Sequence, residues 1–432
     1  MKLEKKQAVA PLLPANENIS SGASFTSAVF NVSTGMIGAG IMSIPATLKV
    51  LGIIPGFIAV VVVALLVEVT VEFMLRYTNS GECDTYGGLM GESFGRPGSL
   101  ALQICVMVTN LGCLIIYLII LGDVLSGNES HLGILQEWFG THWWTSRAYS
   151  LLFVVLFVML PMLLLRRVES LQYASAVSIL LAVVFVVICS MMAISALLQG
   201  KTQHLRLFPD FSSLYSIFSL FTTIPVYVIG FSFHVNVHPI RAELGKPSEM
   251  ARAVRVSLIL CVGIYCAIGF FGYLLFGDAI MADMLVNFDH NSSSTMGAII
   301  NDFVRLSYAI HLMLVFPVMN FSLRANVDEF LFPKKPLLAT DTTRFVSLTC
   351  ALLSLTYLAA VAVPNIWIFF QYLGSTTVLC LSFIFPASII LRDVHGLSTK
   401  RDRIMATMMI AVAVLTGAIT IATNMYGGTK AS

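Results

Sequence analysis

Charged residues are scarce in this chain of 432 residues. Asp, Glu, Lys and Arg make up only 11% of it, whereas hydrophobic residues make up 57% and the mean hydropathy is +0.87. Soluble domains carry about 25% charged residues, which cover their surface. The scarcity therefore excludes a soluble enzyme, a nucleic-acid-binding protein and a disordered scaffold. It predicts an integral membrane protein whose first partner is the lipid bilayer.

Paired cysteines and catalytic motifs are missing as well. The eight cysteines form no C-x-x-C pair, and six of them lie inside apolar runs. Zinc sites and redox motifs carry such pairs, so we expect no metal site, no disulfide framework and no cofactor. The apolar runs contain no HExxH, GxSxG or paired-aspartate motif, so catalysis is not predicted either. The six cysteines are Cys105, Cys113, Cys189, Cys261, Cys266 and Cys380.

Long apolar runs are what the chain has in abundance. A membrane helix needs about 20 apolar residues, because the hydrocarbon core is about 30 Å thick. Outer-membrane barrel strands alternate over about ten residues and do not fit these runs. We therefore predict an all-α membrane protein with a tail at 1–24, a transporter-like bundle at 25–426 and a tail at 427–432. The eleven predicted spans are 25–48, 51–76, 98–125, 148–166, 171–198, 213–240, 251–276, 297–323, 343–361, 364–391 and 404–426.

The basic residues fall on one side of these spans. Five of the 25 lie on one side, Arg305 lies within a span, and the remaining 19 lie on the side of the N-terminal tail. Cytosolic loops carry an excess of Lys and Arg, so we expect a cytosolic N-terminus and, with eleven spans, a non-cytosolic C-terminus. Asn128 and Asn291 are the sequons that then fall in non-cytosolic loops, as glycan acceptors or by chance. The five basic residues are Lys49, Arg147, Lys201, Arg206 and Lys430.

Two spans contain residues that interrupt helices. The segment 30–45 of the first span contains three glycines and a proline, and the segment 225–239 of the sixth contains two prolines and a glycine. In one span alone, glycine can simply allow close helix packing. The two spans are five helices apart, which makes the second unit of five an inverted copy of the first, and paired broken helices of this kind mark transporter sites. Freed N–H groups suit a carboxylate and freed carbonyls an ammonium, so the arrangement favours a free amino acid.

These segments resemble the amino acid/auxin permease family. The first-helix string 30–41 (FNVSTGMIGAGI) and the sixth-helix string 233–240 (FHVNVHPI) are similar to its signatures, as are Gly272–Gly277 and Val315–Pro317 followed by Arg324. Leu135–Gly140 and Pro364–Trp367 are most similar to the plant vacuolar-type members. The resemblance covers about residues 25–425. It implies a LeuT-like 5+5 inverted repeat plus one extra helix, proton- or sodium-driven transport of amino acids, and a vacuolar membrane, with the plasma membrane as the alternative.

One departure from the family concerns sodium. Its sodium-coupled members have an asparagine in the first helix, where this chain has Thr34, and a threonine in the eighth, where Met313 and Val315 stand. A thioether or isopropyl group supplies no hard oxygen ligand for sodium. The sequence therefore favours protons over sodium as the coupling ion.

The predicted substrate site lies at the two breaks. We expect backbone N–H groups at Gly38–Gly40 to hold the carboxylate and an apolar pocket near Phe231–Phe233 to favour neutral side chains. Thr109 and Asn110 in the third span and Thr376 in the tenth either line this cavity or hydrogen-bond their own helices. Asn236 is a candidate for capping the broken sixth span. The full set of candidate substrate residues is Thr34, Gly35, Gly38, Ala39, Gly40, Phe231, Ser232, Phe233, Thr109 and Asn110.

Ionisable groups inside spans are the candidates for proton coupling. His311, Glu68 and His234 are proposed for this role, and the alternative for His311 is a neutral ring hydrogen-bonded to backbone. His234 and His238 share a helix face, but no Asp, Glu or Cys nearby completes a metal site.

Two charged pairs are expected within spans. Glu72 and Arg76 stand four residues apart and are expected to form a structural ion pair, and Asp302 and Arg305 are expected to pair with each other.

Two other classes remain. A channel would need a filter-like repeated element, and none is found in the sequence. A non-transporting amino acid sensor on the same fold is the other alternative, together with a sodium symporter; gradient-driven uptake distinguishes a carrier from both non-carriers.

Overall fold

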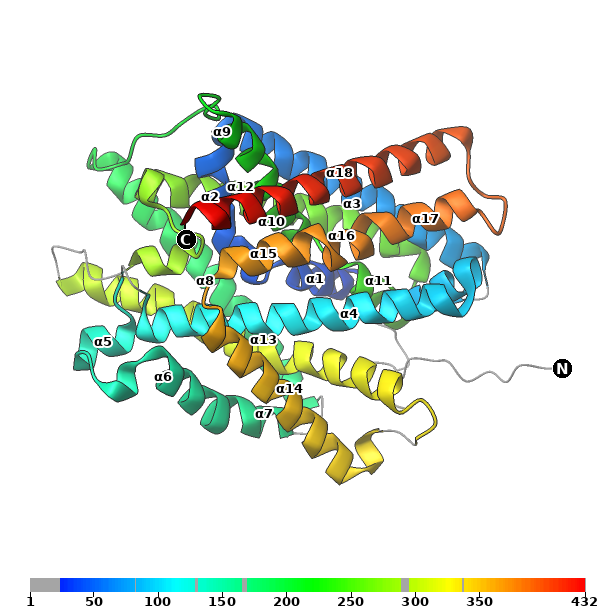
Figure 1. The fold of residues 1–432 in the computed structure, drawn as a ribbon, viewed down its shortest axis with the longest axis horizontal. Helices are drawn as coiled ribbons and strands as arrows, with labels where there is room; N and C mark the ends of the chain where they lie inside the picture. Colours follow the sequence, from blue (N-terminus) through cyan, green and yellow to red (C-terminus); the bar gives the residue numbers. More distant parts are fainter. Residues whose placement is uncertain are drawn as a thin grey trace.

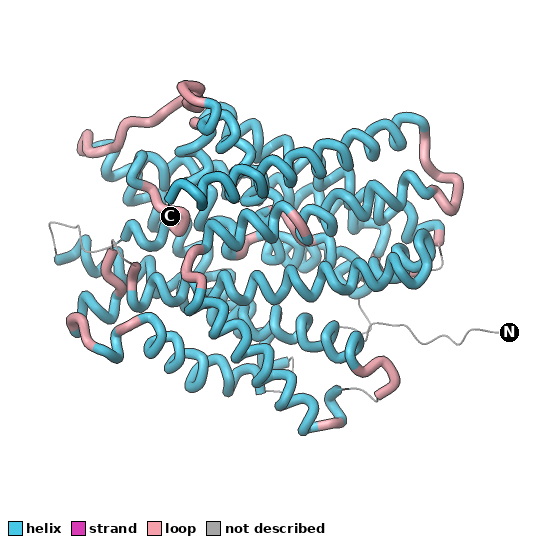
Figure 2. The backbone as a smooth tube through the Cα atoms, in the orientation of Figure 1, coloured by secondary structure: helices cyan, strands magenta, loops and turns pink. Residues whose placement is uncertain are grey.

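The computed structural model describes residues 24–81, 83–128, 131–164, 169–288, 295–335 and 338–431. Within these ranges the chain is helical throughout and contains no strand. Most loops lie at the two ends of the bundle, while short non-helical pieces interrupt helices in its middle (Figure 2). The loops of a membrane protein belong in water, so the irregular pieces in the middle mark where the helices break.

Ten helical segments are long and apolar enough to cross a bilayer, and the bent pair Phe25–Met36 and Gly40–Leu51 makes an eleventh. The eleven predicted spans are therefore confirmed as helical segments. The elements are α1 (Phe25–Met36), η1 (Ala39–Ser43), α2 (Ile44–Leu51), α3 (Ile53–Ser80), α4 (Tyr86–Ser126), α5 (Ile134–Phe139), η2 (Trp143–Thr145), α6 (Arg147–Val154), η3 (Val155–Met159), α7 (Leu160–Leu164), α8 (Glu169–Leu198), α9 (Leu214–Ser219), η4 (Leu220–Thr223), α10 (Ile224–Gly230), α11 (His234–Glu243), η5 (Pro247–Glu249), α12 (Met250–Phe276), η6 (Gly277–Ala279), η7 (Met284–Phe288), α13 (Thr295–Leu331), η8 (Leu338–Thr340), α14 (Thr342–Ala362), α15 (Ile366–Ser375), α16 (Thr377–Leu379), η9 (Cys380–Ile384), α17 (Phe385–Arg392) and α18 (Lys400–Ala431).

The helices run along the long axis of the molecule, with α1 near its centre between α4 and α15 (Figure 1). The helices α13, α8 and α4 pack together on one side, and α12 packs on α1, α2 and α3. The end that carries α5 is called the α5 end below, and the opposite end carries the loop between α17 and α18 (Figure 1). The C-terminal part of α18 lies toward the α5 end.

The outer surface of the bundle is apolar. Phe157, Ile58, Ile259 and Met408 are all more than half exposed, at 67%, 58%, 67% and 62%. In a water-soluble protein such side chains would be unfavourable in these numbers, whereas hydrocarbon tails are as apolar as they are. The exposed stripes are therefore the lipid-facing sides of the helices.

The structure adds breaks that the sequence analysis did not predict. The tenth span breaks at Thr376, whose φ and ψ are −121° and −95°, and continues as a π-helix over Cys380–Ile384. The third span begins as early as Tyr86 and bends at Gly95, whose φ is 67°. The last helix, α18, runs on to Ala431, through most of the segment expected to be a separate tail.

Candidate functional site

The first span breaks between Met36 and Ala39. The α1 helix ends at Met36, Gly38 is extended with φ −137° and ψ −153°, and the chain then turns by 54° into η1 and α2. Gly38 has no side chain with which to cap the first N–H groups of η1. The predicted break in this span is confirmed, at the glycine cluster where it was expected.

The sixth span breaks over Phe231–Phe233. The α10 helix ends at Gly230 and α11 begins at His234, with Phe233 as its N-cap. Prolines begin α10 at Pro225 and lie inside α11 at Pro239, so both short helices carry a residue that weakens a continuous helix. The second predicted break is confirmed as well.

The two breaks touch each other through backbone. A Cβ atom on Gly40 would lie 3.0 Å from the Cα atom of Gly230, closer than real Cβ atoms ordinarily approach. A Cβ atom on Gly35 would lie 3.2 Å from the side-chain amide nitrogen of Asn236. Glycine is therefore required at Gly40 for contact between the breaks, and Asn236 lies against α1, at the place where a role in holding the broken helix was expected.

Two buried tyrosines from other helices reach the breaks. The Tyr265 hydroxyl, on α12, lies 2.7 Å from the Met36 carbonyl oxygen and 2.6 Å from that of Gly230. The Tyr308 hydroxyl, on α13, donates to the carbonyl of Gly38 at 2.9 Å. Carbonyls freed by a break must find donors inside a membrane, and these hydroxyls supply them. Sequence reasoning missed both residues, because a tyrosine within an apolar run reads as an ordinary hydrophobic side chain.

The side chains of the second break are packed and buried. Phe231 and Phe233 are 0% and 2% exposed, and the Phe231 ring packs edge-on against Tyr265 at 4.9 Å between centroids. The hydroxyl of Ser232 lies 3.2 Å from that of Ser382, on η9. The expected pocket region is thus aromatic, with one serine pair that joins the sixth span to the tenth.

The other polar candidates divide into two groups. Thr109 donates to Thr377 at 2.8 Å, and the Asn110 amide donates to Ser322 at 3.1 Å, so these residues join α4 to α16 and α13 rather than binding their own helix. Thr34, whose hydroxyl donates to the Phe30 carbonyl, binds its own helix. Ala39 begins η1 directly after the break.

The histidine candidates lie at different depths around the breaks. His311, on α13, is 1% exposed, and its ring lies 4.9 Å from that of Tyr308, which binds the Gly38 carbonyl. His234 contacts the Thr70 hydroxyl at 2.9 Å, and His238 contacts the Thr78 hydroxyl at 2.8 Å. Across the described ranges, no three His, Cys, Asp or Glu side chains lie close enough together to hold a metal ion.

Glu68 lies away from the breaks. Its carboxylate accepts a hydrogen bond from Arg255, on α12, at 2.6 Å. The Arg255 side chain is 64% exposed and that of Glu68 is 24% exposed. The structure therefore places Glu68 in a partly exposed ion pair between α3 and α12, and His311 is the committed coupling residue nearest to the first break.

One expected ion pair is confirmed and the other is wrong. Glu72 and Arg76 pair at 3.0 Å, and Arg76 also binds Asp402 on α18. Asp302 and Arg305 were expected to pair, but they do not bind each other. Asp302 accepts from the Trp138 indole at 2.8 Å, and Arg305 binds Glu137 at 2.7 Å. Three residues apart on a helix permits a pair, yet both side chains find partners on α5 instead.

Of the two sequons, Asn128 is described and Asn291 lies outside the described residues. Asn128 is exposed and follows the C-terminal end of α4, toward the α5 end. Its side-chain oxygen accepts from the backbone of His131 at 3.1 Å.

Thr376 binds its own helix through the Tyr372 carbonyl at 2.6 Å, one of the two readings left open by the sequence.

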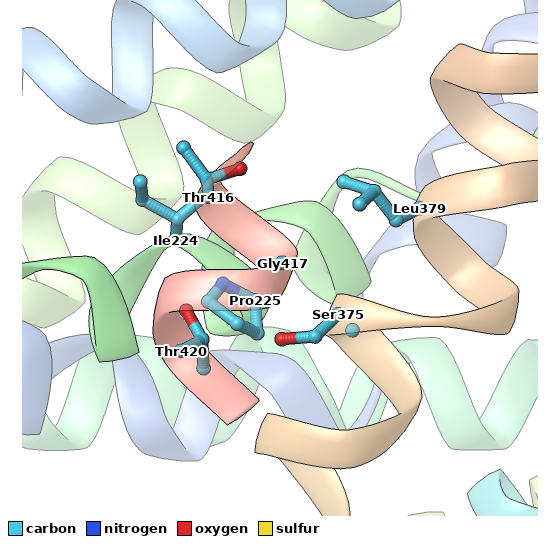
Figure 3. A pocket seen from close by; sticks show the side chains of 8 residues that line it. Ile224, Pro225, Ser375, Leu379, Thr416, Gly417 and Thr420 are labelled. Atoms are coloured by element: carbon cyan, nitrogen blue, oxygen red, sulfur yellow. The ribbon is translucent and has the colours of Figure 1, made fainter. Parts of the chain in front are cut away.

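A small hollow of about 140 Å³ lies where the sixth span, the tenth span and α18 meet (Figure 3). Gly374 and Gly417 allow the close approach there, because Cβ atoms on them would lie 2.5 Å from Pro225 and 2.8 Å from the Ser375 carbonyl. The hollow does not include the break residues, and it reads as a tight helix crossing. It is lined by Ile224, Pro225, Gly374, Ser375, Leu379, Thr416, Gly417 and Thr420.

Comparison with known proteins assigns this architecture. Residues 21–427 match the family model described as "Transmembrane amino acid transporter protein". Two relatives from Arabidopsis thaliana are the amino acid transporters AVT6C and AVT6D. The first is 56% identical over 96% of this chain and 97% of its own length, and the second 54% identical over 96% and 97%.

Solved structures with low sequence identity share the fold. The inward-facing conformation of Mhp1 matches with a TM-score of 0.56 at 13% identity, over 96% of this chain and 95% of that one. A Na⁺-coupled sialic acid symporter in a substrate-bound outward-open state matches with a TM-score of 0.54 at 12% identity, over 93% and 90%. The fold is thus LeuT-like, as the resemblance implied. With its paired broken helices and this match over nearly its whole length, the chain belongs to the transmembrane amino acid transporter family and is not an enzyme.

Proposed function

We propose that this amino acid transporter moves neutral amino acids by alternating access, with protons as the coupling ion and the substrate bound between the two broken spans. The observation that carries the proposal is the backbone contact between the breaks at Gly40 and Gly230. It brings freed N–H and carbonyl groups of both spans to one place in the middle of the bundle.

The substrate's charged groups are matched by backbone. The N–H groups around Gly38–Gly40 begin a helical run through η1 and α2, and they suit the carboxylate. The carbonyls of Met36 and Gly230 suit the ammonium group. The buried rings of Phe231 and Phe233 leave no charge to bind a charged side chain, which supports neutral substrates.

His311 is the proposed proton carrier among the three candidates. Its ring packs on Tyr308, whose hydroxyl binds the Gly38 carbonyl, so a charge on the ring acts on the first break through one intermediate side chain. Histidine titrates nearest to physiological pH among the ordinary side chains. Thr34 binds its own helix, so its hydroxyl supports sodium coupling no better than the sequence did.

The proposed orientation puts the α5 end on the non-cytosolic side. The basic residues on the opposite side of the spans support a cytosolic N-terminus. A vacuolar membrane is supported by similarity to vacuolar-type members of the family alone.

Uptake of labelled neutral amino acids into proteoliposomes tests the proposal. We expect uptake to follow an imposed pH gradient with or without sodium. His311→Gln is expected to lower gradient-driven uptake at least tenfold while exchange of labelled for unlabelled substrate continues, because exchange needs no net proton movement. His395→Gln is the matched control, since His395 pairs with Glu92 in the loop between α17 and α18.

Three results would contradict parts of this account. Uptake that requires sodium would assign the coupling to that ion. Normal gradient-driven uptake by His311→Gln would remove His311 from the coupling. Absence of both uptake and exchange would favour a sensor on the transporter fold.

A further inference from the structure

A buried aspartate outside the committed candidates lies beside the first break. Asp283 precedes η7, in the segment that connects α12 to α13 at the α5 end. Its side chain is in a residue only 3% exposed, and its Oδ1 atom accepts a hydrogen bond from the Leu285 backbone at 3.0 Å. Its Oδ2 atom is buried without a hydrogen-bond partner. A buried carboxylate oxygen without a partner is costly, unless it is protonated or the site opens to water.

The segment around Asp283 packs directly on the broken first span. The Ser43 hydroxyl, at the end of η1, donates to the Ala282 carbonyl at 2.6 Å. Met284, Leu285 and Phe288 of η7 are each at most 1% exposed, so this connection is folded into the core. The segment 280–288 therefore covers the first break from the α5 end.

The charges that face Asp283 come from three helices. Asp123 on α4 is paired with Arg147 on α6, and both act on Asp283 electrostatically. Arg305 on α13 also acts on it, but it is already bound to Glu137 of α5. The described residues of η1, the other element packed on η7, carry no charge.

The cluster thus has one carboxylate more than it has guanidinium groups. Asp123 and Glu137 each have an arginine, and Asp283 is the carboxylate without one. Burial, and after it the charge of Asp123, raises the pKa of Asp283 to about 8, against the weaker opposing effects of the Leu285 N–H group and the two arginines. A carboxyl group with this pKa is neutral in an acidic compartment and ionises in mildly alkaline solution.

We propose that Asp283 binds a proton from the compartment at the α5 end, and that its neutral form holds η7 against η1 and closes this end of the transport site. The proton comes from water or a buffer acid and binds Oδ2, without any change in the chain's covalent bonds. The ionised form repels Asp123 and draws water to Oδ2, so that η7 separates from η1 and the first break opens toward this end. The inference rests on the proposed function, since it assumes a transport site between the breaks.

The position of Asp283 relative to Tyr308 supports this coupling. Tyr308 donates to the Gly38 carbonyl inside the first break, and the charge of Asp283 acts on Tyr308. Ionisation of Asp283 therefore changes the electrostatic field at a hydroxyl that holds the broken backbone. Protonation and the geometry of the first break are linked through Tyr308 as well as through Ser43.

Substrate exchange at equal pH on both sides of proteoliposomes tests the gate without any coupling gradient. In the wild type we expect the exchange rate to be steady between pH 6 and 7 and to fall about tenfold by pH 9, because about one tenth of a group with a pKa near 8 is neutral there. Asp283→Asn stays neutral and is expected to vary less than twofold over this range. Asp278→Asn is the matched control, because Asp278 lies five residues away with a side chain 60% exposed, in a surface pair with Arg206.

A second measurement reports on the gate even if exchange cannot be detected. Hydrogen–deuterium exchange of the peptide 280–288 in detergent, corrected for the pH dependence of the chemical rate, is expected to increase from pH 6 to pH 9 in the wild type and in Asp278→Asn. It is expected to stay low in Asp283→Asn. The wild type needs no substitution to fold, so its profile alone decides the point if the variant is unstable.

The outcomes separate the gate from the proposed function. A peptide 280–288 equally protected at both pH values in the wild type would overturn the gate, as would an Asp283→Asn exchange rate that falls like that of the wild type. Loss of exchange in the wild type at every pH, with the peptide still opening at pH 9, would overturn the proposed transport and leave Asp283 as a proton-binding site.

Discussion

Individual side chains hold together places where the helices end or break, and Asp393 is the clearest case outside the membrane spans. It follows α17 with a positive φ of 47°, and its carboxylate accepts hydrogen bonds from Tyr77, Ser398 and Arg403. Although burial raises the pKa of Asp393, the hydrogen bonds from Ser398, Tyr77 and Arg403 outweigh it and hold the pKa well below its usual range. The folded state therefore favours the ionised form.

Asp393→Asn is expected to lower the free energy of unfolding by about 1–2 kcal/mol at pH 7. Asparagine tolerates the same left-handed backbone, so the change isolates the charge. Because the folded-state pKa is lowered, the wild-type advantage is present above the unfolded-state pKa of about 4 and is lost as the pH falls below it. Chemical unfolding in detergent at pH 7 and pH 3.5 measures this.

Asp210→Asn serves as the comparison for Asp393. Asp210 is exposed and bonds only within its own turn, to Ser212. Its substitution is expected to change stability by less than about 0.5 kcal/mol. A difference between wild type and Asp393→Asn that persists unchanged at pH 3.5 would contradict the assignment.

Residue-scale predictability differed between types of side chain. Glycines and prolines signalled both breaks, because their effect on a helix is local and can be read from sequence. The partners of Arg305 and Asp302 lie on α5, more than 160 residues earlier, so spacing along one helix predicted the wrong pair. Tyr265 and Tyr308 could have been found only by asking which hydroxyls inside apolar runs face freed carbonyls.

At the scale of elements, the closest approach is between the two broken spans. Three glycines form a graded series: a Cβ atom meets backbone at 3.0 Å at Gly40, the end of the Asn236 side chain at 3.2 Å at Gly35, and nothing within 4 Å at Gly263 on α12. Backbone cannot move aside as a side chain can, so the cost of a methyl group should follow this order.

Gly40→Ala is expected to reduce substrate exchange at least tenfold and to lower the free energy of unfolding by about 1–3 kcal/mol. Gly35→Ala should have a smaller effect on both, and Gly263→Ala should leave exchange unchanged. Exchange in proteoliposomes and thermal unfolding in detergent provide the two readouts. Equal activity for Gly40→Ala and Gly263→Ala would show that the breaks do not need this contact.

The tenth span shows why some breaks escape sequence reasoning. Its break at Thr376 involves a single non-helical residue, and the first residues after it return to helix. Neither proline nor positive φ is needed there, so the small-residue run at 374–377 carried too little signal. The break is set by packing, with Gly374 pressed against Pro225 of the broken sixth span.

For the whole molecule, a buried ion pair ties the α5 end together. Arg305 is 0% exposed and binds Glu137 at 2.7 Å, the Leu132 carbonyl at 2.6 Å and the Phe288 carbonyl at 3.3 Å. One guanidinium group thus connects α13 to α5, to the segment after α4 and to η7. A lysine keeps the charge but has no planar fork to reach all of these groups.

Arg305→Lys is expected to lower the free energy of unfolding by about 2–4 kcal/mol, since buried acceptors lose their donors. Arg206→Lys is the matched control at the same end, where the partly exposed pair with Asp278 should contribute less than about 1 kcal/mol. Thermal unfolding of both variants in detergent gives the comparison. A wild-type melting temperature for Arg305→Lys would mean that packing alone fixes this end.

The bundle as a whole was the most predictable level. Eleven apolar runs are fixed by the thickness of the hydrocarbon core, and all eleven appear as helical segments. The order of the spans across the bundle depends instead on long-range packing, as between α13 and α8, which no single-span pattern encodes. The resemblance at the first and sixth spans supplied that order.

The Tyr265 hydroxyl carries one hydrogen, yet two carbonyl oxygens lie within 2.7 Å of it. At any moment one of the two acceptors is therefore incompletely bonded, and the hydroxyl is shared between the two halves of the repeat. An amino acid's ammonium group brings three hydrogens to the same pair of acceptors. Under the proposed function, arrival of the amine thus ends a shortage of donors, and the substrate is recognised partly by how many hydrogens it can give.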